Sequence, residues 1–169
     1  MTHMIVGISD CKVSGDRDAV LTTYALGSCV AVMVHDPVAS VAGMLHYMLP
    51  EASLDRTKAE TNPFMFADTG ISGLLQKVCE GGANRRRLVV RIAGGAQVLD
   101  GHDLFQIGKR NYLAARKLLW KAGVLVSAER VGGASSRTVR LEVATGRVWV
   151  REDGVDQPLG ETIRSAGGA

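Results

Sequence analysis

The sequence has few of the residues that mark unusual protein classes. It contains four prolines against twenty glycines, too few prolines for a collagen-like or proline-rich chain. It also has no apolar run of the roughly 20 residues that a membrane helix requires. Charged residues interrupt the first 25 positions, which excludes the apolar core of a signal peptide. We therefore expect no membrane insertion and a cytoplasmic location.

An excess of charge of one sign is also absent. The formal net charge is +3 at pH 7, well below what a clustered basic surface for nucleic acid usually needs. We therefore expect no nucleic-acid partner. A hydrophobic share of 46% over 169 residues is sufficient for the core of one domain.

Cysteine is scarce, and the three present are Cys11, Cys29 and Cys79. An odd number at wide spacing does not suit a disulfide framework, and no CxxC pair indicates a zinc site. Each cysteine is then either a small buried hydrophobic residue or a reactive thiol, and the first is the commoner case. A reactive assignment needs further support from the neighbouring sequence.

Short apolar segments separated by Gly, Asp and Pro predict mostly β-structure. Asp36 and Pro37 predict a hairpin turn. Apolar residues at i, i+3, i+4 and i+7 predict two helices and point Cys79 into a core. The expected strands are 4–8, 20–24, 29–34, 41–48, 88–92, 124–126, 138–143 and 147–150, and the expected helices are 64–79 and 109–121.

These elements predict a single α/β domain over residues 1–151. The strands are too short, and too often joined by hairpins, for a doubly wound parallel sheet. From Glu152 onward the apolar pattern fades into Asp, Gly, Pro and Ser. Residues 152–169 are therefore expected to form a frayed, partly disordered tail without chemistry.

The most informative stretch is residues 22–32, TTYALGSCVAV. An expected strand runs into Gly27 and Ser28, and Cys29 then opens the next apolar strand. A glycine turn at this point can hold the thiol out of the sheet and leave backbone N–H groups free to bind an oxyanion. Cys29 is therefore a candidate nucleophile.

A reactive cysteine needs a partner, because its thiolate is a minor species at neutral pH unless a base or a positive charge stabilises it. His46 lies on the strand that follows Cys29 across the expected turn, and antiparallel pairing would bring the two side chains together. Judged from the residues alone, a solvated or hydrogen-bonded structural histidine is the commoner alternative.

Two motifs carry a resemblance to a known family. Residues 23–32 (TYALGSCVAV) and 43–50 (GMLHYMLP) resemble the signature of the CheD family, the chemoreceptor glutamine deamidases of bacterial chemotaxis. The resemblance covers about residues 4–151. Further similar stretches follow in the family's order: FADT at 66–69, IAGGA at 92–96, IGKRN at 107–111, and Gly132, Gly133 and Arg137.

The resemblance implies a fold and a set of site residues. The family fold is a sandwich of two mixed β-sheets flanked by helices (α/β/β/α), similar to the cytotoxic necrotizing factor deamidase domain. The family's catalytic cysteine, histidine and threonine match Cys29, His46 and Thr23. Plain β-propensity is the alternative explanation for the threonine. Gly27 and Ser28 would bind the oxyanion or the substrate.

The implied activity is conversion of glutamine to glutamate on methyl-accepting chemotaxis receptors, through a thioester on Cys29 and without a metal or organic cofactor. The same intermediate would allow hydrolysis of glutamyl methyl esters. A CheC-type phosphatase is a further implied partner. Two alternatives stay open: a cysteine amidohydrolase with another protein substrate, and a binding module that only docks a CheC-type phosphatase.

Other polar residues have two readings each. His35 and the basic run Arg85–Arg87 are expected to be solvated, although the basic run would also suit an acidic receptor surface. Asn111 either holds a loop or touches the substrate. The chain departs from the family pattern at Ala134–Ser136, which leaves the role of Arg137 open.

Overall fold

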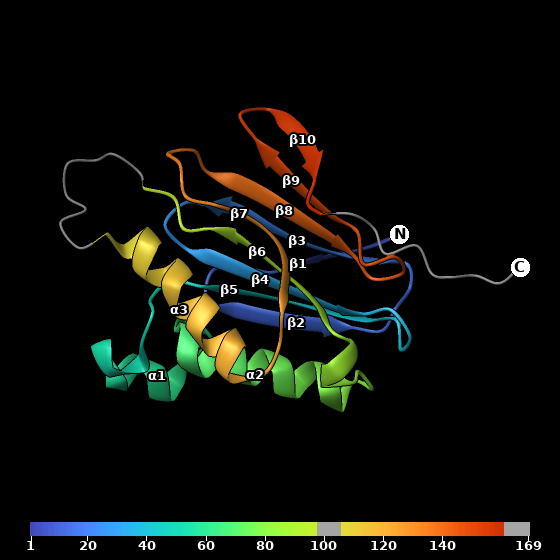
Figure 1. The fold of residues 1–169 in the computed structure, drawn as a ribbon, viewed down its shortest axis with the longest axis horizontal. Helices are drawn as coiled ribbons and strands as arrows, with labels where there is room; N and C mark the ends of the chain where they lie inside the picture. Colours follow the sequence, from blue (N-terminus) through green and yellow to red (C-terminus); the bar gives the residue numbers. More distant parts are fainter. Residues whose placement is uncertain (98–105, 161–169) are drawn as a thin grey trace, which may run out of the picture.

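Two β-sheets packed face to face form the centre of the molecule, and helices cover one side of this sandwich (Figure 1). The computed structural model describes residues 1–97 and 106–160. Sheet A has the order β1-β3-β8-β9-β10 and sheet B the order β2-β5-β4-β6-β7. The strands of sheet A are β1 (Thr2–Ile5), β3 (Ala19–Leu26), β8 (Arg137–Glu142), β9 (Val148–Glu152) and β10 (Val155–Pro158). Those of sheet B are β2 (Asp10–Ser14), β5 (Val41–Tyr47), β4 (Val30–Asp36), β6 (Val89–Gly94) and β7 (Val126–Val131).

Both sheets are mixed. In sheet A, β1 pairs with β3 in parallel, and the other neighbouring strands pair antiparallel. In sheet B, β6 and β7 form the parallel pair. The expected sandwich of two mixed sheets is confirmed.

The helices lie on the outer face of sheet B. The α-helices of the described residues are α1 (Arg56–Thr61), α2 (Ala67–Glu80) and α3 (Ile107–Lys121), with short 3₁₀ turns η1 (Ala52–Leu54), η2 (Pro63–Met65) and η3 (Arg85–Arg87). The second helix, α2, packs on β2 and β5, and α3 packs on β4, β6 and β7. In residues 1–97 and 106–160 no helix covers the outer face of sheet A, so these residues show α/β/β layers without the second helical layer expected from the resemblance.

Strand β4 separates two cores, because it is buried on both faces along its whole length. Side chains alternate across a strand, so Val30, Val32 and Val34 point toward the helices. Ala31 and Met33 point toward sheet A and join the core between the sheets. A strand covered on both faces needs a continuous apolar run, which this segment has.

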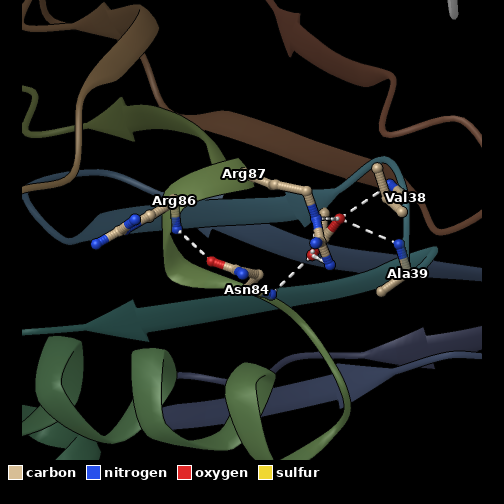
Figure 2. Close-up of polar contacts among 6 residues, drawn as sticks. Val38, Ala39, Asn84, Arg86 and Arg87 are labelled. Atoms are coloured by element: carbon tan, nitrogen blue, oxygen red, sulfur yellow. Dashed lines mark hydrogen bonds and ion pairs between the residues drawn. The ribbon is translucent and has the colours of Figure 1, made fainter.

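The buried carboxylate of Asp36 holds the β4–β5 hairpin at its turn. Figure 2 labels the residues that donate to it: Val38, Ala39, Asn84 and Arg87. This carboxylate accepts three backbone N–H groups at 2.7 to 3.1 Å, those of Val38, Ala39 and Asn84. Arg87 adds an ion pair at 2.9 Å. Burial alone would raise the pKa of Asp36, but these donors outweigh it and hold that pKa well below its usual range. The expected turn is confirmed. Arg85–Arg87 are exposed, as expected, and Arg87 also pairs with the buried carboxylate of the turn.

Some elements depart from the sequence-based expectations. No strand is predicted at Asp10–Ser14, yet this segment forms β2 at the edge of sheet B, where half of a strand's side chains can be polar. Strand β10 pairs with β9, so sheet A continues into the segment expected to be a frayed tail. Residues 161–169 of that tail lie outside the described residues. Within the described ranges, no helix is both long and apolar enough to cross a membrane.

Candidate active site

The segment between β3 and β4 places Cys29 where the chain passes from sheet A to sheet B. Strand β3 ends in a bulge: its pairing with β8 shifts between Thr23 and Leu26, and Ala25 has a φ of 53°. Bulges redirect the chain and the side chains near functional sites. Residues 27–29, which we name the crossing turn, follow. The Cys29 thiol is free and partly buried against the core between the sheets.

Donors from other segments hold all three carbonyl groups of the crossing turn. The carbonyl of Gly27 accepts the Ala96 N–H at 2.9 Å. The carbonyl of Ser28 accepts Nδ2 of Asn111 at 3.0 Å. The carbonyl of Cys29 accepts the Gly95 N–H at 2.9 Å. Because each carbonyl has a fixed partner, the backbone around the sulfur has a defined orientation before any substrate binds. A preset backbone is what an oxyanion site made of N–H groups requires.

The paired glycines at 92–96 (IAGGA) permit the approach of β6 to this turn. Gly94 has a φ of 107°, which favours glycine. A Cβ added at Gly94 would overlap the carbonyl oxygen of Cys29. The motif therefore has a physical role in this chain: it lets backbone pack directly on the residue that carries the candidate nucleophile.

His46 is fully buried on β5 and faces sheet A. In the β4–β5 register it lies opposite Ala31, and opposite residues of an antiparallel pair point to the same side. Ala31 belongs to the core between the sheets, and Cys29, two residues earlier, packs against the same core. Both side chains therefore face the core between the sheets, and His46 lies on the strand paired with β4, which begins one residue after Cys29.

Thr23 links the two sheets through its hydroxyl group. Its Oγ1 lies 2.7 Å from the carbonyl oxygen of Val6 and 2.7 Å from Nδ1 of His46. A hydroxyl has one hydrogen and a carbonyl oxygen can only accept, so Thr23 donates to Val6. Nδ1 of His46 must then donate to Oγ1. This network assigns the proton of the neutral imidazole to Nδ1 and leaves a lone pair on Nε2.

Burial sets the protonation state of both candidate residues. It lowers the pKa of His46 to about 4. It also raises the pKa of the Cys29 thiol, which outweighs the opposite effect of that residue's own backbone N–H. Nε2 of His46 is buried and has no hydrogen-bond partner in the described part of the chain. At neutral pH the two groups are a neutral thiol and a neutral imidazole whose Nε2 can accept a proton.

Asn111 ties together the two segments that carry these groups. It is fully buried as the fifth residue of α3, and its Nδ2 donates to the carbonyls of Ser28 at 3.0 Å and Met48 at 2.8 Å. Ser28 precedes Cys29, and Met48 lies two residues after His46. Of its two readings from the sequence, holding the backbone is the one that these contacts show.

Arg137 holds the glycine at the end of β6, the one that packs on Cys29. Its buried guanidinium donates to the carbonyls of Gly94 at 3.3 Å and Gly132 at 2.7 Å. An ion pair with Glu152 at 3.2 Å compensates its charge. Arg137 therefore acts on the crossing turn through the loop that Gly94 begins, a role that the motif order alone did not reveal.

His35 is buried, and the expectation that it is solvated is wrong. Its Nε2 lies 3.0 Å from the carbonyl oxygen of Val143, and since a carbonyl only accepts, this Nε2 carries the proton. Gly146 packs against the ring so closely that an added Cβ would overlap it. The expectation failed because β4 extends through Asp36, which keeps His35 inside the sandwich.

The other two cysteines face a different core from Cys29. Cys11 is buried on β2, and burial raises the pKa of its thiol to about 12. Cys79 packs against the core between sheet B and the helices, as the helical periodicity predicts. Over residues 1–97 and 106–160, no three His, Cys, Asp or Glu side chains gather in a way that could hold a metal ion.

Comparison with known proteins identifies the family. Residues 48–152 match the family described as CheD chemotactic sensory transduction. The protein named probable chemoreceptor glutamine deamidase CheD from Solibacter usitatus is 52% identical over 168 residues, which are 99% of each chain. This chain belongs to the CheD family. A CheD protein of the same description from Syntrophus aciditrophicus is 51% identical over 155 residues, 91% of this chain and 96% of the relative.

The CheD family match begins at Met48, after all three candidate catalytic residues. The Solibacter relative nevertheless aligns over nearly the whole chain, including the crossing turn and β5. A more distant CheD relative from Pyrococcus horikoshii is 39% identical over 154 residues, 90% of this chain and 93% of its own. Among solved structures, the hypothetical protein YfiH of Bacillus licheniformis aligns with a TM-score of 0.44 and 18% identity, covering 74% of this chain and 50% of that one.

Proposed function

We propose that this CheD-family protein is a cytoplasmic cysteine-dependent deamidase that converts glutamine side chains of chemoreceptors to glutamate, with a CheC-type phosphatase as a further partner. The names of its relatives supply the reaction and the substrate class. The observation that carries the proposal is the Thr23–His46 hydrogen bond, because it leaves Nε2 of His46 as a base on the strand paired with the segment after Cys29.

Acylation begins when Nε2 of His46 takes the proton of the Cys29 thiol. The sulfur attacks the carboxamide carbon of the glutamine, and the carbonyl electrons move onto oxygen. Backbone N–H groups around Ser28 and Cys29 stabilise this oxyanion, with Gly27 giving the bend that exposes them. The C–N bond then breaks as Nε2 returns its proton to the departing ammonia.

Deacylation uses the same base for a second time. Nε2 of His46 removes a proton from water, and the water oxygen attacks the thioester carbon. The C–S bond breaks, the sulfur recovers the proton from the imidazolium, and glutamate leaves. A glutamyl methyl ester would reach the same thioester with methanol as the leaving group, so ester hydrolysis is a natural side activity.

Thr23 serves as a neutral positioning residue in this mechanism. Its hydroxyl accepts a hydrogen bond from Nδ1–H of His46 and donates one to the carbonyl of Val6. These two bonds fix both the tautomer and the orientation of the ring. The hydroxyl supports an imidazolium only by its dipole, because it carries no charge. Replacing Thr23 should therefore reduce turnover less than replacing Cys29.

The decisive test incubates the protein with purified cytoplasmic fragments of chemoreceptors and identifies converted glutamines by mass spectrometry. We expect conversion by the unchanged protein and none by Cys29→Ala. Cys79→Ala is the matched control, because it removes a partly buried thiol from the other core and should leave conversion intact. An active Cys29→Ala protein would refute the nucleophile, and an inactive but folded unchanged protein would refute the substrate class.

A further inference from the structure

The end of α3 and the loop that follows it carry an exposed apolar surface. Trp120 is 77% exposed, Leu125 80% and Leu113 51%. Single exposed apolar residues are common, but several around one hollow mark a binding surface. Here they border a hollow of about 470 Å³ between α3 and the start of β7. This α3–β7 groove is lined by Leu113, Arg116, Lys117, Trp120, Val124, Leu125 and Val126.

Positive charge accompanies the groove. The sequence of α3, IGKRNYLAARKLLWK, contains several Lys and Arg residues and no Asp or Glu. Arg116 is paired with Glu129 at 3.6 Å. Lys117 and Lys121 enter no ion pair in the part of the chain that the structure describes. An apolar hollow beside unpaired cations suits a partner that combines apolar and acidic side chains.

The same helix connects the groove with the candidate active site (Figure 1). Asn111, the fifth residue of α3, holds the carbonyl of Ser28 in the crossing turn. Trp120 lies further along the same helix, about 14 Å away along the axis at 1.5 Å per residue. At 3.6 residues per turn these two residues lie on opposite faces of α3, so one rigid helix links the groove on its exposed face with the crossing turn at its buried face.

We propose that the α3–β7 groove docks an acidic amphipathic helix of the same receptor on which Cys29 acts. This inference rests on the function proposed above. Apolar side chains of that helix fill the hollow around Trp120, and its carboxylates face Lys117 and Lys121. An anionic bilayer would also attract tryptophan and lysine. A flat surface does not fill a hollow between a helix and a strand, however, so the geometry favours a helix.

The test measures binding and turnover of the same receptor cytoplasmic fragment. Binding is measured in a Cys29→Ala background, so that the substrate stays intact, and KM and kcat are measured with Cys29 present. We expect Trp120→Ser and Lys117→Glu each to weaken binding and raise KM about tenfold or more, with kcat at saturation nearly unchanged. The Lys117→Glu effect should shrink as salt is added, because salt screens exposed charges.

Matched controls lie on sheet A, away from the helices. Val155→Ser removes another exposed apolar side chain, 54% exposed on β10, and Arg147→Glu reverses an exposed charge beside the β8–β9 turn. Both controls should leave KM and binding within about twofold of the unchanged protein. Thermal unfolding of every variant checks that the exposed changes have not altered the fold.

The outcomes separate the docking surface from the proposed function. Turnover with an unchanged KM in both groove variants would overturn the docking surface and leave the deamidase standing. Binding that depends on Trp120 without any turnover would keep the docking surface and overturn the deamidase. Binding of the groove to vesicles of phosphatidylglycerol and phosphatidylcholine, with no effect on the receptor fragment, would assign the surface to a membrane and overturn the helix. Absence of both binding and turnover would refute both.

Discussion

Two histidines at opposite ends of the β4–β5 hairpin are both buried, but their ring nitrogens form different hydrogen bonds. His46 is 0% exposed and His35 4%, and both lie in the sandwich interior. Burial lowers the pKa of each. Nε2 of His35 donates to a carbonyl, whereas His46 donates through Nδ1 to Thr23 and keeps Nε2 without a partner among the described residues. The two histidines are similarly buried, but they differ in which ring nitrogen forms a hydrogen bond.

The contacts around His35 are all satisfied, whereas one buried nitrogen of His46 lacks a partner among the described residues. At the His35 end, Gly146 packs on the ring and Val143 occupies its donor nitrogen, so every close contact serves the fold. At the His46 end, an unpartnered buried acceptor remains, which costs stability in an apolar interior. Such a cost is typical of functional sites, where the missing partner is a substrate or a reacting proton.

The largest expected difference comes from replacing each histidine by glutamine. His46→Gln should lower kcat by at least about a thousandfold, because it removes the proton acceptor. His35→Gln should keep turnover but lose roughly 1 to 3 kcal/mol of unfolding free energy, because it disturbs a buried hydrogen bond. Turnover assays and urea unfolding of both variants measure this. An equal loss of turnover in folded samples of both variants would contradict the different roles assigned to the two histidines.

Alanine at two tightly packed glycines, one against Cys29 and one against His35, should give the next largest effect. Gly94 and Gly146 both have positive φ, and an added Cβ would overlap Cys29 at one position and His35 at the other. Gly94→Ala should reduce kcat about a hundredfold or more in the folded protein, because it displaces the crossing turn. Gly146→Ala should lower stability by about 2 kcal/mol and spare turnover. Turnover per folded molecule, with the folded fraction taken from circular dichroism, distinguishes the two.

Thr23 offers an intermediate test of what fixes the ring of His46. Thr23→Val keeps the shape but removes the hydroxyl, so the imidazole can adopt the other tautomer. We expect kcat to fall roughly tenfold to a hundredfold with little change in KM. Thr23→Ser retains the hydroxyl and should stay within a few-fold of the unchanged protein. Similar kinetics for the valine and serine variants would show that the hydrogen bond to Nδ1 does not matter for turnover.

The pH dependence gives the most direct measure of the buried base. The pKa of His46 is about 4 when folded against an ordinary 6.5, so between these values the unfolded chain binds a proton that the folded protein does not. Stability present above pH 6.5 should therefore fall by up to about 3 kcal/mol as the pH drops toward 4. His46→Gln should show a smaller decline in urea midpoint.

Turnover should follow the same buried group. Because Nε2 accepts a proton only when the ring is neutral, kcat/KM should stay high until the pH falls close to 4 and decline below it. His35→Gln should leave this acidic limb where it is. An acidic limb near pH 6.5, typical of an exposed histidine, would contradict the buried base.

Part of the fold and of the site follows from local patterns. The Asp36 turn, the helix that contains Cys79 and the strand that begins after Cys29 all have short-range signals, and the structure contains all three. The edge strand β2 and strand β10 were missed, because their residues are mostly polar and they are strands only through pairing with β5 and β9. His35 was misplaced for a related reason, since its burial depends on sheet A.

The sequence by itself determined which reactive groups are present, the hairpin that brings His46 back toward Cys29, and the family to which the chain is similar. Only the tertiary structure decided which nitrogen of His46 is free. That choice depends on a hydroxyl from the opposite sheet, which in turn is oriented by the carbonyl of Val6. Contacts between residues on different sheets leave no periodicity in the sequence, because they arise only when two separately formed layers pack together.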